Sequence, residues 1–292
     1  MTLYEYSTHL SSLLDISSFP DISLNGVQIG AEDRELKKVA FAVDASLHSI
    51  REAVKEKADI LVVHHGLFWG YPIAIDGDHY RRVKEAIEGG LMLYAAHIPL
   101  DAHPLYGNNA MIASILSLEE KEGFGEWKGK TIGVKGMLPK EMDADEIATA
   151  LGFTGPGLRM IDGGKKSFRS VAIVSGAGSS DVEDAIKAGV DLFITGEIKH
   201  DVYWSAVESG LSVLAGGHYM HIAVLLGYVD GFFAPCTGLD IAGYAVLHQV
   251  HGDHSKLECS AALYEQHLVV VGNVHQVTEI LLGFVDYFLE NL

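Results

Sequence analysis

The chain has 292 residues, 48% of them hydrophobic, which is enough for two lobes or one large α/β domain with a full core. Its 21 basic and 39 acidic residues give a formal charge of −18, so nucleic-acid binding is disfavoured because phosphate contact requires a basic face. Two cysteines without CxxC spacing indicate neither a disulfide framework nor a cysteine zinc site. The chain shows no secretory leader and no apolar run of membrane-spanning length, so we expect a cytoplasmic protein with no membrane association.

The first part of the chain alternates predicted strands with predicted helices. Apolar runs predict strands at residues 39–43, 59–63 and 91–97. Amphipathic periodicity predicts helices at 48–58 and 80–90, the second closed by glycine. Continuous apolar strands between amphipathic helices are typical of a mostly parallel sheet with helices on both faces. We therefore predict an α/β fold.

The same order of elements recurs after residue 170. The segment "EAVKEKADILVVHHG" resembles "DAIKAGVDLFITGE", and "LMLYAAHIPLD" resembles "LSVLAGGHYMH". The repeat predicts a helix at 179–189, with serine capping and a terminal glycine, between two strands. An internal duplication of this kind predicts two related α/β lobes.

A polar, glycine-rich segment at residues 120–130 is a plausible boundary between the lobes. New β structure is expected directly after it, followed by a helix with an aspartate cap at residue 143. The predicted domains are therefore residues 1–125 and residues 126–292.

Polar side chains of metal-binding type lie at the predicted strand ends. His64 and His65 follow one strand, His97 ends the next with Asp101 four residues later, and His218 leaves the matching strand of the second lobe. The carboxyl ends of parallel strands meet at one edge of a sheet, where α/β proteins build their sites. Imidazoles with carboxylates suit Zn, Fe, Mn or Ni, and the alternative is a pair of loop histidines that bind no metal.

Adjacent strand residues point to opposite faces of a sheet, which restricts how His64 and His65 can cooperate. We expect both to face one site only if the strand has already ended before them. Gly66 makes a turn at that point plausible.

Several motifs together resemble the Nif-three-like family, named as GTP cyclohydrolase 1 type 2 homologs. They are "SLNGVQIG", "VVHHGLFW", "AAHIPLD", "GNNA", "DLFITGEIKHD" and "VLAGGHY", in this order. The resemblance implies two related α/β lobes, a centre of two divalent metal ions between them, and a ring-shaped homohexamer. The implied ligands are His64, His65, Asp101 and His218, with His97 near them, and a glutamate four residues after the last histidine.

The sequence departs from the family pattern at that glutamate. His221 and Ile222 stand where the family has threonine and glutamate, but His275 and Glu279 repeat the H-x-x-T-E spacing near the C-terminus. Glu279 could complete the site, His221 could replace the glutamate, or one ligand could be missing. We favour Glu279.

Two classes of function follow. The resemblance implies a metal-dependent hydrolase that opens the imidazole ring of a purine nucleotide with water activated by two ions. His97 or Glu197 would then transfer protons. For Glu197, a structural role in capping and packing is the alternative. The second class is a non-catalytic metal carrier, or an assembly scaffold that binds protein partners through its ring.

Overall fold

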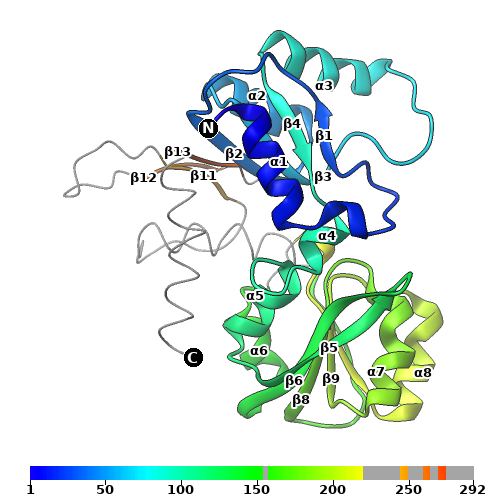
Figure 1. The fold of residues 1–292 in the computed structure, drawn as a ribbon. Coiled ribbons are helices and arrows are strands. Elements are labelled where there is room, and N and C mark those ends of the chain that lie inside the picture. Colours follow the sequence, from blue (N-terminus) through cyan, green and yellow to red (C-terminus); the bar gives the residue numbers. More distant parts are fainter. Residues whose placement is uncertain (154–156, 220–243, 249–258, 264–268, 274–292) are drawn as a thin grey trace. The chain divides into compact units, whose positions relative to one another are not determined.

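The computed structural model describes residues 1–153, 157–219, 244–248, 259–263 and 269–273. The chain divides into two compact units (Figure 1). The first unit contains Met1–His97 together with the C-terminal strands β11 (Tyr244–His248), β12 (Cys259–Leu263) and β13 (Val269–Asn273). The second contains the described residues of Ile98–Leu225.

The sheet of the first unit has a parallel centre and antiparallel edges. Its strand order is β1 (Gly26–Ile29), β4 (Met92–Ala95), β3 (Ile60–His65), β2 (Lys38–Asp44) and β13. The neighbours β4, β3 and β2 are parallel, whereas β1 and β13 run antiparallel to them. β11 and β12 form a separate antiparallel pair.

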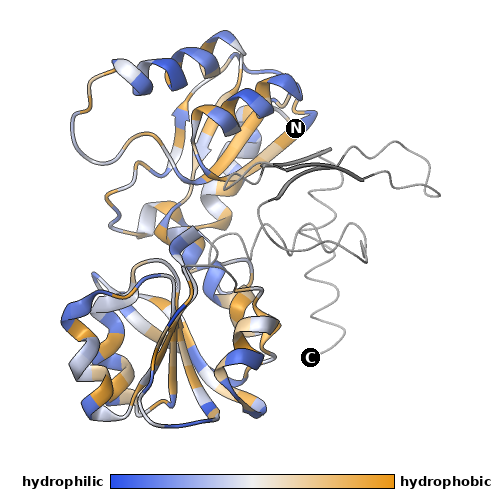
Figure 2. Cartoon of the chain, turned by 180° about the vertical axis from the view of Figure 1, so that it is seen from behind, coloured by the Kyte–Doolittle hydropathy of each residue, from blue (hydrophilic) through white to orange (hydrophobic). Residues whose placement is uncertain are grey.

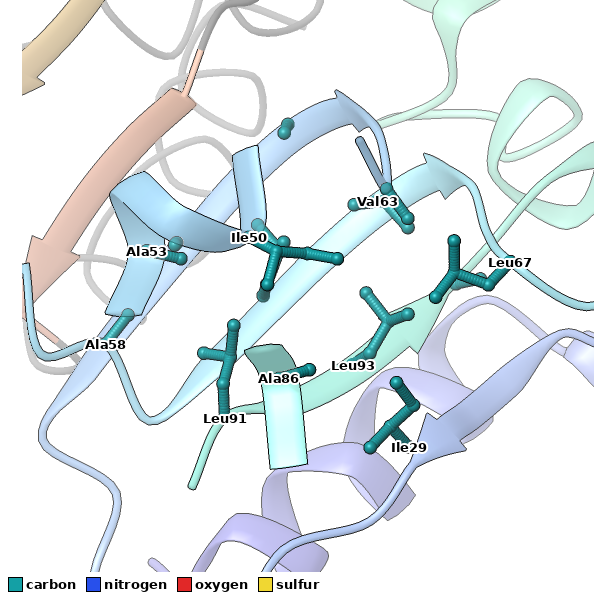
Figure 3. Packing of buried hydrophobic residues seen from close by; sticks show 14 of the residues in the cluster. Ile29, Ile50, Ala53, Ala58, Val63, Leu67, Ala86, Leu91 and Leu93 are labelled. Carbon is teal, nitrogen blue, oxygen red and sulfur yellow. The ribbon is translucent and has the colours of Figure 1, made fainter. Parts of the chain in front are cut away.

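Helices cover this sheet on both faces. They are α1 (Leu3–Leu13), the short 3-10 turn η1 (Ile16–Ser18), α2 (Leu47–Lys55) and α3 (Gly77–Glu88). Ile50 of α2 and Ala86 of α3 pack with Val63 and Leu93 in one buried apolar cluster (Figure 3). Tyr94 points to the face opposite Leu93, and its hydroxyl lies 3.0 Å from that of a serine in α1.

The sheet of the second unit is built in a similar way. Its strand order is β5 (Glu119–Trp127), β6 (Lys130–Met142), β8 (Phe168–Val174), β9 (Leu192–Thr195), β10 (Ser212–Ala215) and β7 (Arg159–Ile161). The central strands β8, β9 and β10 are parallel, and the other pairings of this sheet are antiparallel.

Two groups of helices cover the faces of this second sheet. One group is α4 (Ile98–Asp101), α5 (Asn108–Ile115) and α6 (Ala144–Ala150), and the other is η2 (Gly178–Asp181), α7 (Val182–Ala188), η3 (His200–Val202) and α8 (Tyr203–Ser209). Ile173 packs with α5 and α6, and its neighbour Val174 packs with α7 and α8. The central strands β8, β9 and β10 are accordingly mostly apolar, while the helices have a hydrophilic side (Figure 2).

The α/β fold with two related sheets is confirmed, with three differences in detail. Each sheet is mixed rather than mostly parallel, because antiparallel strands flank the parallel centre. The segment at 120–130, expected as a boundary, is mostly strand β5, in a hairpin with β6, and the N-terminal part of the first unit ends at His97. Gly123 allows β5 and β6 to pack closely, because a Cβ at this position would lie 2.8 Å from a threonine methyl group of β6.

The third difference concerns the start of the helix predicted at 179–189. It is the turn η2 followed by α7, and no serine side chain caps α7. Ser179 instead accepts a hydrogen bond from the amide of Lys199 at 2.8 Å, so its hydroxyl is used elsewhere. The terminal glycine is confirmed, because Gly189 ends α7 with a φ of 67°.

Strand register supports the internal duplication. Ile60 of β3 and Leu192 of β9 occupy equivalent positions, as do Met92 of β4 and Ser212 of β10. At the amino ends of the central strands, Asp59 accepts hydrogen bonds from two main-chain amides at the start of β2, at 2.8 and 2.9 Å. Asp191 accepts two equivalent bonds from the start of β8, each at 2.9 Å.

Candidate metal centre

Three histidines gather at the carboxyl end of the first sheet. His64 and His65 are the last two residues of β3, and His97 follows β4 by two residues. The ring centroids lie 4.7 Å apart for His64 and His65, 4.9 Å for His64 and His97, and 5.7 Å for His65 and His97. One ring nitrogen from each residue lies within 4.8 Å of the others, so the cluster could hold a metal ion.

The expectation that β3 ends before the paired histidines was wrong. His65 still pairs with Asp44 of β2 within the parallel ladder. The two rings nevertheless come together, because each is turned by a hydrogen bond to a different neighbouring strand: His64 toward Ala96 after β4, and His65 toward Asp44.

Each imidazole of the cluster is oriented through its Nδ1 atom. Nδ1 of His64 lies 3.1 Å from the carbonyl oxygen of Ala96, and Nδ1 of His65 lies 2.7 Å from Oδ1 of Asp44. Nδ1 of His97 lies 3.0 and 3.1 Å from the two carboxylate oxygens of Asp21. A carbonyl or carboxylate oxygen only accepts, so Nδ1 donates and Nε2 carries the lone pair that can bind a cation.

Asp21 and Asn25 hold His97 from two sides. The Asp21 side chain is 1% exposed, and it accepts hydrogen bonds from the Asn25 amide at 3.0 Å and the Ser23 main-chain amide at 3.1 Å. Asn25 in turn accepts from the main-chain amide of His97 at 2.8 Å. Burial raises the pKa of the Asp21 carboxyl, but hydrogen bonds from His97 and Asn25 outweigh it and hold that pKa well below its usual range.

Sequence reasoning did not identify Asp21 or Asp44 as part of this site. Asp44 ends an apolar strand next to the one that carries His65, a position from which it could have been proposed. Asp21 lies far from His97 in the chain and carries no comparable signal in a single sequence.

The loop after the paired histidines is fixed by Gln28. Its amide oxygen accepts from the main-chain amides of Leu67 at 2.6 Å and Phe68 at 3.2 Å. A Cβ on Gly66 would lie 2.3 Å from the same amide group, so a larger residue there would displace the Gln28 side chain. The indole of Trp69 donates to the Gly66 carbonyl at 3.1 Å and lies edge-on to the His97 ring, 5.2 Å away.

In the second unit, Asp101 is held by neighbours that leave its carboxylate little freedom. Its Oδ1 accepts from the Asn108 amide at 2.6 Å and from the Ser175 hydroxyl at 2.7 Å. Asn109 donates to the Asp101 carbonyl at 3.1 Å and accepts from the main-chain amide of Ser175 at 2.6 Å. The loop after β8 and the start of α5 therefore orient Asp101 together.

His218 and Glu197 form a second pair in this unit. Nδ1 of His218 lies 3.1 Å from Oε1 of Glu197, which is 57% exposed and follows β9 by two residues. Gly176, with a φ of 73°, lies beside the His218 ring, since a Cβ there would be 3.7 Å from it. Glu279 and His221, the two candidates for the remaining ligand, lie outside the described residues.

The family comparison is consistent with this geometry. The family model for Duf34/NIF3 (NGG1p interacting factor 3) matches residues 1–226. A GTP cyclohydrolase 1 type 2 homolog from Archaeoglobus fulgidus is 47% identical over 219 residues, which are 75% of this chain and 87% of the relative. Another, from Deinococcus radiodurans, is 45% identical over 211 residues, 72% of this chain and 80% of the relative.

Solved structures show the same fold. TTHA1606 from Thermus thermophilus matches with a TM-score of 0.68 and 37% identity, over 82% of this chain and 100% of that one. Protein ybgI, of unknown function, matches with a TM-score of 0.70 and 31% identity, over 79% and 94%. In the described part of the chain, no helix combines the length and apolar character that crossing a bilayer requires. The chain belongs to the Duf34/NIF3 family.

Proposed function

We propose that the protein is a metal-dependent hydrolase with two divalent ions held by His64, His65, Asp101, His218 and Glu279. The observation that carries the proposal is the histidine cluster at the carboxyl ends of β3 and β4, with Nδ1 of every ring already engaged. Site residues at this edge are the usual arrangement in α/β enzymes.

The residues present fit a divalent ion such as Zn, Fe, Mn or Ni. A histidine that donates its second ring N–H to a carboxylate or carbonyl is the arrangement found around protein-bound metals. A bound ion would supply Lewis-acid polarisation and lower the pKa of water. Asp101 matches this pattern as well, because Asn108 and Ser175 fix one of its oxygens.

Proton transfer in this proposal falls to Glu197. Its carboxylate is exposed and lies against His218, so it can accept a proton from a substrate or from water while it orients that ring. His97, the other residue expected to transfer protons, is one of the three clustered histidines and is therefore also a candidate ligand.

The substrate class rests on the relatives that are named GTP cyclohydrolase 1 type 2 homologs, from which we infer a purine nucleotide. The second candidate is a non-catalytic metal carrier or an assembly scaffold. The same histidine cluster supports this second candidate, because three oriented imidazoles explain metal binding but do not define a substrate. We infer a homohexamer in either case, to be checked by light scattering.

The test is ring opening of GTP by the full chain, followed by mass spectrometry as the gain of one water. Chelated protein reloaded with Zn²⁺, Mn²⁺, Fe²⁺ or Ni²⁺ should turn over GTP, while His64→Ala and Glu197→Gln should lose at least tenfold in rate. His200→Ala, also in the second unit, is the matched control. Metal retention without turnover of any purine nucleotide would favour the carrier or scaffold.

A further inference from the structure

We propose that His97 is a metal ligand and Asp21 its positioning residue, so that the first unit alone completes a three-histidine site for one divalent cation. The inference rests on the proposed metal dependence. It makes His97 a ligand and leaves proton transfer to Glu197 alone. It adds a ligand to the set implied by the family resemblance, and it assigns a purpose to Asp21 and Asn25.

His97 lies almost as close to His64 as His65 does, with centroid distances of 4.9 and 4.7 Å, and the centroids of His65 and His97 are 5.7 Å apart. Tetrahedral zinc with Zn–N bonds of about 2.0–2.1 Å needs nitrogens about 3.4 Å apart. The nitrogens here lie within 4.8 Å of one another, so the rings would have to move closer together around a bound ion. Three histidines with an open fourth position are a known zinc ligand set.

Asp21 is built to fix the orientation of one imidazole. Both of its oxygens contact Nδ1 of His97, and its side chain is almost fully buried. Asn25 binds the Asp21 carboxylate and the His97 main-chain amide at once, so ring and backbone are held by the same segment. This arrangement keeps Nδ1 protonated and presents Nε2, the tautomer that a ligand needs.

The equivalent positions of the second unit lack this set. In strand register, His64 corresponds to Gly196 and His97 to Gly217, while Asp44 corresponds to Gly176. The histidines and the carboxylate are therefore a feature of the first unit and not of the repeated scaffold.

The experiment is a Co²⁺ titration of the full chain after chelation, in a variant that lacks ligands of the second unit. Asp101→Ala with His218→Ala should retain one Co²⁺ per chain, with visible absorption and quenching of the adjacent Trp69. In that background Asp21→Asn should weaken Co²⁺ binding by about 10–100-fold, and His97→Ala by more. His97→Gln, similar in size, serves if the alanine variant fails to fold.

Three variants serve as controls. Asp59→Asn removes a buried carboxylate at the opposite end of the same sheet, so it should lower stability and leave Co²⁺ affinity unchanged. Trp69→Phe should abolish the quenching, because the indole beside His97 is removed. Trp204→Phe, which removes an exposed tryptophan, should leave the quenching intact.

Co²⁺ affinity that stays within twofold on replacing His97, or that is unaffected by Asp21→Asn, would overturn the inference. Loss of all Co²⁺ in the variant lacking Asp101 and His218 would overturn it as well. One Co²⁺ retained there, and lost with His97, supports it whether or not the wild type turns over GTP. The outcome is therefore separable from that of the proposed hydrolase.

Discussion

The two units share a scaffold and differ at one edge of it. Both have three parallel central strands in the same register and an aspartate, Asp59 or Asp191, that ties the amino ends together. At the carboxyl ends, the first unit has His64 and His65 where the second has Gly196 and Glu197.

The residues that hold the amino ends of the strands together are alike in the two units. At the carboxyl ends, Asp44, His64 and His97 of the first unit stand where the second unit has glycine. Glycines here have their own purpose. Because Gly196 has no side chain, the backbone of Gly176 in the loop after β8 and the backbone of His218 can both pack closely against it.

The largest loss of stability is expected from Gly196→Ala. The new Cβ would lie 2.6 Å from the Gly176 carbonyl oxygen and 3.0 Å from the His218 Cα, and backbone atoms cannot rotate away. We expect a loss of about 3 kcal/mol in the free energy of unfolding, measured by urea denaturation. Gly157→Ala is the control, because its Cβ would meet nothing nearer than 3.7 Å. Equal stability of the two variants would contradict this account.

Much of the scaffold was predictable from one sequence, because apolar strands and amphipathic helices follow simple periodicities. The repeat was visible for the same reason. The antiparallel edges were not predictable, since β5 reads as a polar, glycine-rich linker and only its pairing with β6 makes it a strand.

The candidate site was predictable in part. His64, His65 and His97 stand at strand ends, where parallel topology brings neighbours together. Asp21 could not be found, because its role depends on a contact with His97 across 76 positions of the chain. A single sequence carries no record of such a pair.

A smaller effect, on the pH dependence of stability, is expected at Asp191. Burial raises the pKa of Asp191, but Lys165 and main-chain amides outweigh it and lower that pKa from 3.8 to about 2. The stabilisation is therefore fully present above pH 3.8 and is lost as the pH falls through 2. The difference in unfolding free energy between wild type and Asp191→Asn should shrink by about 2 kcal/mol from pH 5 to pH 2.

Urea denaturation followed by circular dichroism at each pH measures that difference. Asp184→Asn, an exposed aspartate of α7, is the control and should show little change over the same range. If the two aspartates are equivalent, Asp59→Asn should cost a similar amount at neutral pH. An Asp191→Asn variant as stable as wild type at pH 5 would refute the equivalence.

The smallest effect concerns the first helix after the opening strand of each repeat. Ser46 caps α2 through a reciprocal bond with Ser49, whereas α7 has no side-chain cap. We expect Ser46→Ala to cost about 1 kcal/mol of unfolding free energy. Ser180→Ala should change it by less than about 0.5 kcal/mol. An equal loss of unfolding free energy in the two variants would mean that the Ser46 cap does not stabilise α2 as its hydrogen bonds indicate.

The central claim is that the strand-end histidines of the first unit form a metal site. The most direct measurement is metal content per chain, by mass spectrometry, in protein purified without chelator, for wild type, His64→Ala and Glu279→Ala. We predict two ions per chain in wild type and fewer in both variants. No metal in wild type, or wild-type content in His64→Ala, would contradict the claim.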